Sequence, residues 1–125
     1  TPVYYAHPSG RILSGMDRLF YAAGNYFTHK PAAVIASARR GGTTATLDTL
    51  SKYFGIAQMP VISSTYWNMV HGNKPEEVLQ DAEGLQVMRN LGRNMAWLLK
   101  CLEAGRNTGV AVPVNEYDNK TNFIR

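Results

Sequence analysis

An apolar run, a polar turn and a helical pattern follow one another without interruption between residues 32 and 55. The apolar run at 32–36 does not alternate with polar residues, which is typical of a strand buried on both faces of a parallel sheet. The turn at 37–44 reads Ser-Ala-Arg-Arg-Gly-Gly-Thr-Thr and leads directly into apolar residues at helical spacing. Because ligands of α/β proteins bind at the carboxyl ends of parallel strands, this turn is the first candidate for a small-molecule site.

The rest of the chain supplies further elements of an α/β protein. Apolar spacing predicts helices over 9–24, from Thr43 or Thr44 to 55 and from 75 to about 104, with a second buried strand at 59–64. Gly84 and Gly92 are points where the last helix can bend, and its Met and Leu stripe, with Cys101, is expected in the core. Strands that alternate with helices predict a parallel sheet with right-handed crossovers. Residues 1–109 then form the domain, and 110–125 form an irregular tail.

Two strands cannot make a sheet that is covered on both faces. From typical sheet sizes we expect about two or three further strands before Thr1, so the chain reads as the carboxyl-terminal portion of a longer domain. The first residue is not methionine, and residues 1–6 resemble the end of a strand, which points the same way. We expect the apolar faces left open to be covered by a second copy of the chain.

Composition excludes several classes of protein. The chain has 125 residues, of which 45% are hydrophobic and 18% charged, which is typical of one globular domain without a membrane span. The net charge is +4, but the thirteen Lys and Arg are scattered, so we expect no nucleic-acid partner. A single cysteine rules out an internal disulfide framework and fits a cytoplasmic protein. His7 and His71 lack a third ligand at metal spacing, so no metal site is expected.

Three loops are expected to meet at the carboxyl end of the sheet, at residues 1–9, 37–44 and 65–72. Together they carry Tyr, Trp, Asn, His and Arg side chains and two adjacent glycines, which suit a planar cofactor that bears oxygen atoms. Arg39 and Arg40 are either a solvated pair or ligand-binding groups, and Tyr66 and Trp67 are better suited to a subunit contact than to the ligand. No side chain is required as an acid or base, so we name no catalytic residue.

Two of these segments resemble a known family. Residues 1–5 read Thr-Pro-Val-Tyr-Tyr and precede a helix with Met-Asp-Arg-Leu-Phe at 16–20, and the Gly-Gly turn follows at 37–44. This combination is similar to the two flavin loops of the NADPH-dependent FMN reductase family. The resemblance extends to about residue 109, and the family's phosphate-binding loop is absent from these residues.

The resemblance implies a flavodoxin-like three-layer α/β/α fold with a parallel sheet, non-covalent FMN, and NAD(P)H as co-substrate. It implies transfer of hydride and electrons to a quinone, a flavin or a similar small-molecule acceptor, by a dimer or tetramer. One segment is expected against the flavin ring and the other at its pyrimidine edge: Thr1, Pro2, Val3, Tyr4 and Tyr5, and then Ser37, Ala38, Arg39, Arg40, Gly41 and Gly42.

Two other functions are open from the sequence. A flavodoxin-type electron carrier has the same fold, although such carriers are typically acidic and this chain is basic. A binding or assembly module that has lost the cofactor is the third hypothesis, because the phosphate loop is not among these residues.

Overall fold

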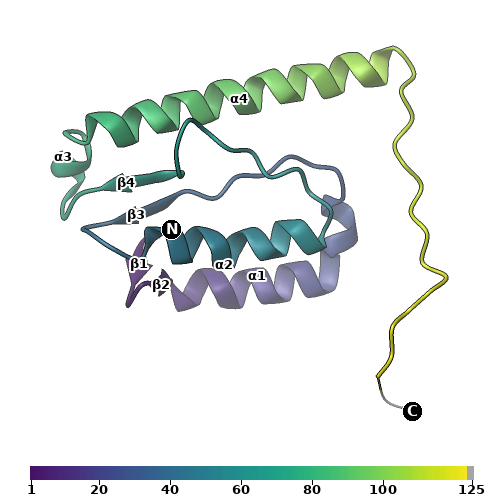
Figure 1. The fold of residues 1–125 in the computed structure, drawn as a ribbon, viewed down its shortest axis with the longest axis horizontal. Coiled ribbons are helices and arrows are strands. Elements are labelled where there is room, and N and C mark those ends of the chain that lie inside the picture. The colour runs from purple at the N-terminus through teal and green to yellow at the C-terminus, as the bar shows by residue number, and fades with distance from the viewer. Residues whose placement is uncertain (124–125) are drawn as a thin grey trace.

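The computed structural model describes residues 1–123 and shows a mixed α/β chain with two small sheets (Figure 1). In chain order the elements are β1 (Val3–Tyr4), β2 (His7–Pro8), α1 (Gly10–Ala23), a short 3-10 helix (Gly24–Phe27), β3 (Ala36–Ala38), α2 (Thr43–Ile56), β4 (Met69–His71), α3 (Pro75–Val78) and α4 (Ala82–Asn107). In Figure 1, α1 and α2 lie to one side of the strands and α4 to the other.

The strands that position the site are β3 and β4, which pair in parallel with Ala38 opposite His71. A parallel bridge between Pro2 and Ser37 adds the first residues of the chain along the other edge of β3. The strands β1 and β2 form a separate antiparallel hairpin. The sheet prediction is thus confirmed in its parallel direction, and the chain has the mixed architecture expected of a flavodoxin-like protein.

Both strand positions differ from the prediction. The run at 32–36 contributes a single bridge at Ala32 and the first residue of β3, Ala36. Because β3 extends to Ala38, Ser37 and Ala38 belong to a strand rather than a loop. The predicted strand at 59–64 contributes only the Val61 partner of that bridge. Its regular part, β4, lies in the stretch expected as a loop.

The second strand is interrupted because its chain leaves the ladder and returns. The amide of Ile62 donates to Ala32 O at 2.9 Å, and pairing resumes where the amide of Ala36 donates to Asn68 O at 3.0 Å. Between these points Ser64 Oγ donates to Val87 O at 2.7 Å, which is a contact with α4. Such a contact depends on a distant helix, so local apolar spacing does not reveal it.

The helices at 9–24 and 43–55 are confirmed as α1 and α2. The single helix expected from 75 is wrong, since the chain forms α3 and α4 with a break at 79–81 and not at Gly84 or Gly92. The break has a local cause: Asp81 accepts the amide hydrogen of Gly84 at 2.9 Å and thereby caps a new helix.

The core lies between α2 and the strands and is formed by Val34, Ala36, Leu47 and Leu50. Only the first half of α4 is buried, through Gly84, Val87 and Leu91. Its second half exposes Trp97, and Cys101 is also exposed, so the expectation of a buried stripe with an inert core cysteine is wrong. The physical reason is length, because 26 residues span about 39 Å and extend past the short strands beneath them (Figure 1).

After α4, residues 110–123 contain no helix or strand and run along one end of the molecule (Figure 1). The tail contacts the end of α2, where Gln58 Nε2 donates to the Tyr117 hydroxyl at 3.4 Å. Residues 124 and 125 of the predicted tail lie outside the described residues. None of the helices within 1–123 is long and apolar enough to cross a bilayer.

Candidate functional site

The first loop is fixed to β3 through its main chain. The Thr1 amino group donates to Ile35 O at 2.7 Å, and the amide of Ser37 donates to Thr1 O at 3.0 Å. These bonds place Thr1 and Pro2 directly beside β3, so two of the residues predicted in separate site segments, Pro2 and Ser37, are neighbours.

The hairpin that follows holds two tyrosines in solvent. Its turn residues Tyr5 and Ala6 have φ values of 49° and 57°, a left-handed conformation that the tight two-residue turn of a hairpin requires. Non-glycine residues adopt this region at a cost, so the turn is strained. Tyr4 is 61% exposed and Tyr5 is fully exposed, which leaves both rings free to meet a ligand.

Gly42 joins the second loop to this hairpin. It has a φ of +92°, and a Cβ built on it would lie 2.8 Å from Val3 Cγ1 and closer still to Ala6 Cα. Only a residue without a side chain permits this approach. The hairpin of β1 and β2, which carries Tyr4 and Tyr5 (the tyrosine hairpin), therefore touches the turn at 39–42 (the arginine turn). Together these two segments form one rim.

The remaining residues of the second loop are open to solvent. Arg39 and Arg40 are both exposed, and an added Cβ on Gly41 would meet no atom within 4 Å. Gly42 is also the N-cap of α2 and supplies no side-chain acceptor, so the first amides of this helix have no side-chain cap.

The third loop meets the rim only in part. His71 pairs with Ala38, and the amide of Gly72 donates to Ala38 O at 3.1 Å, which places the end of β4 next to the arginine turn. Tyr66, Trp67 and Asn68 precede β4 and therefore lie at its amino end. Their main chain does not reach the carboxyl end of the sheet as expected, because β4 begins later than the apolar pattern indicates, but the side chains of Tyr66 and Trp67 line one hollow with His71 and Asp81.

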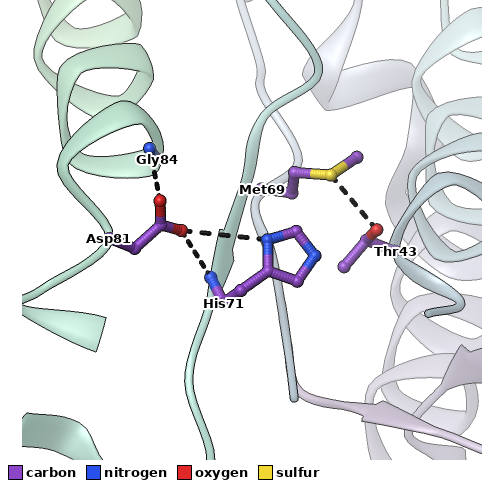
Figure 2. A network of polar contacts seen from close by, with 5 residues as sticks. All are labelled: Thr43, Met69, His71, Asp81 and Gly84. Carbon is purple, nitrogen blue, oxygen red and sulfur yellow. Dashed lines mark hydrogen bonds and ion pairs between the residues drawn. The ribbon is translucent and has the colours of Figure 1, made fainter. Parts of the chain in front are cut away.

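Asp81, which sequence reasoning missed, organises the end of β4 (Figure 2). Its carboxylate accepts the amide hydrogen of His71 at 2.7 Å and that of Gly84 at 2.9 Å, and it lies 3.8 Å from His71 Nδ1. These hydrogen bonds, the one from Gly84 first, lower the pKa of Asp81 below its ordinary value. The available signal was an aspartate just before an apolar helical pattern, which is typical of an N-cap.

On the other side of His71, the Thr43 hydroxyl donates to Met69 Sδ at 3.2 Å (Figure 2). Thr43 is the first residue of α2, so this bond connects α2 to β4. Together with Asp81 it fixes the positions of three elements, α2, β4 and α4, around the end of the strand pair.

A family model described as NADPH-dependent FMN reductase matches residues 1–74, which is more than half of the chain and includes all three loops. The chain belongs to the NADPH-dependent FMN reductase family. Members of this family use FMN, with NADPH as the electron donor. No curated protein and no solved structure matches the chain. The family resemblance inferred from the two loops is confirmed, although the match ends at Lys74 instead of near residue 109.

The rim of this FMN reductase family chain has the chemistry that a flavin ring requires. The ring carries carbonyl oxygens and nitrogens that accept hydrogen bonds, and the rim offers uncapped main-chain amides and two guanidinium groups. Gly41 leaves open space for a planar group, and the exposed tyrosines supply aromatic surface beside it. The residues therefore fit the ring of FMN. Among the described residues, no three His, Cys, Asp or Glu side chains lie close enough to hold a metal ion.

Proposed function

We propose that this chain supplies the flavin-ring site of an FMN-dependent oxidoreductase, which passes hydride and electrons from NAD(P)H to a quinone, a flavin or a similar acceptor. The observation that carries the proposal is the approach of Gly42 to Val3 and Ala6, because it brings the family's two flavin loops into one rim. The proposed FMN-binding residues are those of both loops: Thr1, Pro2, Val3, Tyr4, Tyr5, Ser37, Ala38, Arg39, Arg40, Gly41 and Gly42.

In this proposal the protein binds and orients the cofactor, and the chemistry of accepting hydride and passing it on is supplied by FMN when it is bound. Tyr4 and Tyr5 contact the ring, and the turn at 39–42 presents amides to its pyrimidine edge. Arg39 and Arg40 would hold positive charge beside the bound cofactor and would favour negative charge on it electrostatically. The site stays open on one face, so nicotinamide and acceptor bind there in turn.

We also propose the full three-layer α/β/α arrangement, with further strands beside the first residues of the chain. Supporting this, the edge near Thr1 has an open apolar hollow lined by Ile12, Met16 and Ile35, and Ile35 is 44% exposed. A homo-oligomer is proposed on similar grounds, since Trp97 and Leu99 of α4 are 68% and 49% exposed.

The test replaces both arginines of the turn, Arg39→Ala with Arg40→Ala, in the intact protein. The readouts are FMN affinity, measured by quenching of flavin fluorescence, and the reduction potential of bound FMN. Each lost charge-assisted hydrogen bond is worth about 1.5–3 kcal/mol, so FMN affinity should fall by about tenfold or more. The control variant, Arg89→Ala with Arg93→Ala, removes equal charge from the exposed surface of α4 and should leave both readouts unchanged.

Unchanged affinity and unchanged potential in the double variant of the turn would remove these arginines from the site. Oxidation of NADPH in the presence of a quinone or free flavin separates an enzyme from an electron carrier, which would show none. A protein that stays colourless after incubation with FMN would favour a module without a cofactor.

A further inference from the structure

The main chain of His71, and not its ring, makes the hydrogen bond that holds the end of β4. The hydrogen bond that ties β4 to Asp81 comes from the His71 main-chain amide, at 2.7 Å. The ring itself lies 3.8 Å from the carboxylate, and its side chain is 38% exposed. The fold therefore uses the backbone of this residue and leaves its ring available for another role.

That ring lies beside the proposed flavin rim. His71 is opposite Ala38 in the parallel register, and Ala38 leads directly into the arginine turn. Figure 2 shows the ring projecting from β4 between Asp81 and Thr43, with its Nδ1 on the Asp81 side and its second nitrogen, Nε2, on the Thr43 side. Thr43 follows Gly42, so the first residue of α2, which borders the rim, lies on the Nε2 side of the ring in this view.

Two neighbours fix this position. Gly72, the next residue, is packed so closely on α3 that an added Cβ would lie 2.7 Å from Val78 Cγ2. Met69, two residues earlier on the same face of β4, is bonded to Thr43. A histidine whose backbone is held on both sides and whose ring is exposed is well placed to act on a bound molecule.

We propose that His71, positioned by Asp81, donates a proton from Nε2 to a quinone-type acceptor bound over the rim. This proposal rests on the function proposed above and specifies the acceptor class: a molecule that takes up protons as well as electrons. Asp81 is a positioning residue, and His71 is the group that contacts the acceptor.

The proton balance of quinone reduction requires such a donor. Conversion of a quinone to a hydroquinone takes up two electrons and two protons, and a hydride delivers both electrons and one proton. The second oxygen is left as a phenolate and forms its O–H bond with a proton from the imidazolium form of His71, whose Nε2–H bond breaks to leave neutral imidazole. The ring then regains a proton from solvent through its exposed side.

The charges that act on His71 come from the elements packed around it. Asp81 and Glu83 of α4 line a hollow with the histidine, and so do Tyr66 and Met69. Glu77 of α3 accepts the amide hydrogen of Asn73, two residues beyond the histidine, at 2.6 Å. The cations closest to His71 along the paired strands are Arg39, which follows its strand partner Ala38, and Lys74, three residues further along its own chain. In Figure 2 Thr43 of α2 lies on the side of the ring away from Asp81.

The test compares two acceptors in the FMN-loaded protein. Benzoquinone needs the second proton, whereas ferricyanide accepts electrons alone. His71→Gln should lower kcat with benzoquinone by about 100-fold, in line with the usual contribution of a general acid. The same variant should leave the ferricyanide rate and FMN affinity unchanged. His29→Asn is the control: it removes a histidine that lines a separate hollow with Pro60 and Cys101, and Asn tolerates the positive φ of 64° there.

Two further readouts do not depend on turnover of the variant. Calorimetry with 4-nitrophenolate, a probe for the phenolate oxygen, should show about tenfold weaker binding to His71→Gln, as expected for loss of one hydrogen bond to a charged group. In the unaltered protein, benzoquinone reduction should be slower in D2O while ferricyanide reduction is not. Asp81→Asn keeps a capping acceptor and should shift the pH profile of benzoquinone reduction alone.

Equal loss with both acceptors, no loss with either, or unchanged phenolate binding would overturn the role of His71. An unaltered protein that binds no FMN and oxidises no NADPH with ferricyanide would instead overturn the proposed function. The two failures are therefore distinguishable.

Discussion

Substitution of Gly42 by alanine tests the contact that forms the rim. At a φ of +92° an alanine side chain is strained by about 1–2 kcal/mol. Its Cβ would also lie 2.8 Å from Val3 Cγ1 and closer to Ala6 Cα, an overlap with main-chain atoms that cannot rotate away. Overpacking of this kind adds about 1–3 kcal/mol, so Gly42→Ala should destabilise the protein by about 2–5 kcal/mol in total.

Urea denaturation followed by circular dichroism measures this loss, and the thermal midpoint should fall by roughly 8–20 °C. Gly41→Ala is the matched control, because its Cβ meets no atom within 4 Å and its effect on stability should stay within about 1 kcal/mol. Gly41→Ala should still weaken FMN binding, since the added methyl group projects into the space proposed for the ring. Equal stability of the two variants would refute the contact between the loops.

Three further variants test the packing and the pH dependence. Asp81→Asn should cost stability at neutral pH, because the lowered pKa of the Asp81 carboxyl contributes stability that is fully present above its ordinary pKa of about 4. This cost should shrink as pH falls from there through the lowered pKa, and a pH-independent difference in urea midpoints would contradict this. The hydrogen bond to Asp17 raises the pKa of Tyr53, so the Tyr53→Phe variant should be less stable than the unaltered protein below pH ~10. The two proteins should become equally stable once the tyrosine ionises. Ultraviolet titration checks the raised pKa, and ionisation at the ordinary pH would refute it. Leu50→Ala should lower the free energy of unfolding, measured by chemical denaturation, by about 2–5 kcal/mol, because Leu50 is buried. Ile56→Ala, at an exposed position, should lower it by less than about 0.5 kcal/mol. Equal losses would contradict the assigned core.

The elements that could be predicted are those whose signals are local. The apolar spacing after Ser9 and after Gly42 is sufficient to identify α1 and α2, because a helix forms hydrogen bonds within one segment. The strands were misplaced because a strand forms only where a partner lies, and the pairing of Ala36 with Met69 joins residues 33 positions apart. The apolar stripe of α4 did not predict burial correctly for a related reason. A helix face is buried only where another element packs against it, and the sequence does not show how far the strands beneath α4 extend.

The candidate site likewise has parts that the sequence reveals and parts that only the fold reveals. The residues of both proposed loops could be named from the sequence, and the family match covers the segments that carry them. Asp81 could not be assigned a role, because its importance depends on the main chain of His71, which reaches it only through the fold.

The sequence by itself determined the family, the helices α1 and α2 and the residue types of the two loops, because these depend on neighbouring residues in the chain. Tertiary structure decided that Gly42 contacts the tyrosine hairpin, that Tyr66 and Trp67 line a hollow with His71, and that His71 pairs with the residue before the arginine turn. These outcomes depend on where β3 and β4 begin to pair, and hydrogen bonds between distant segments set that register.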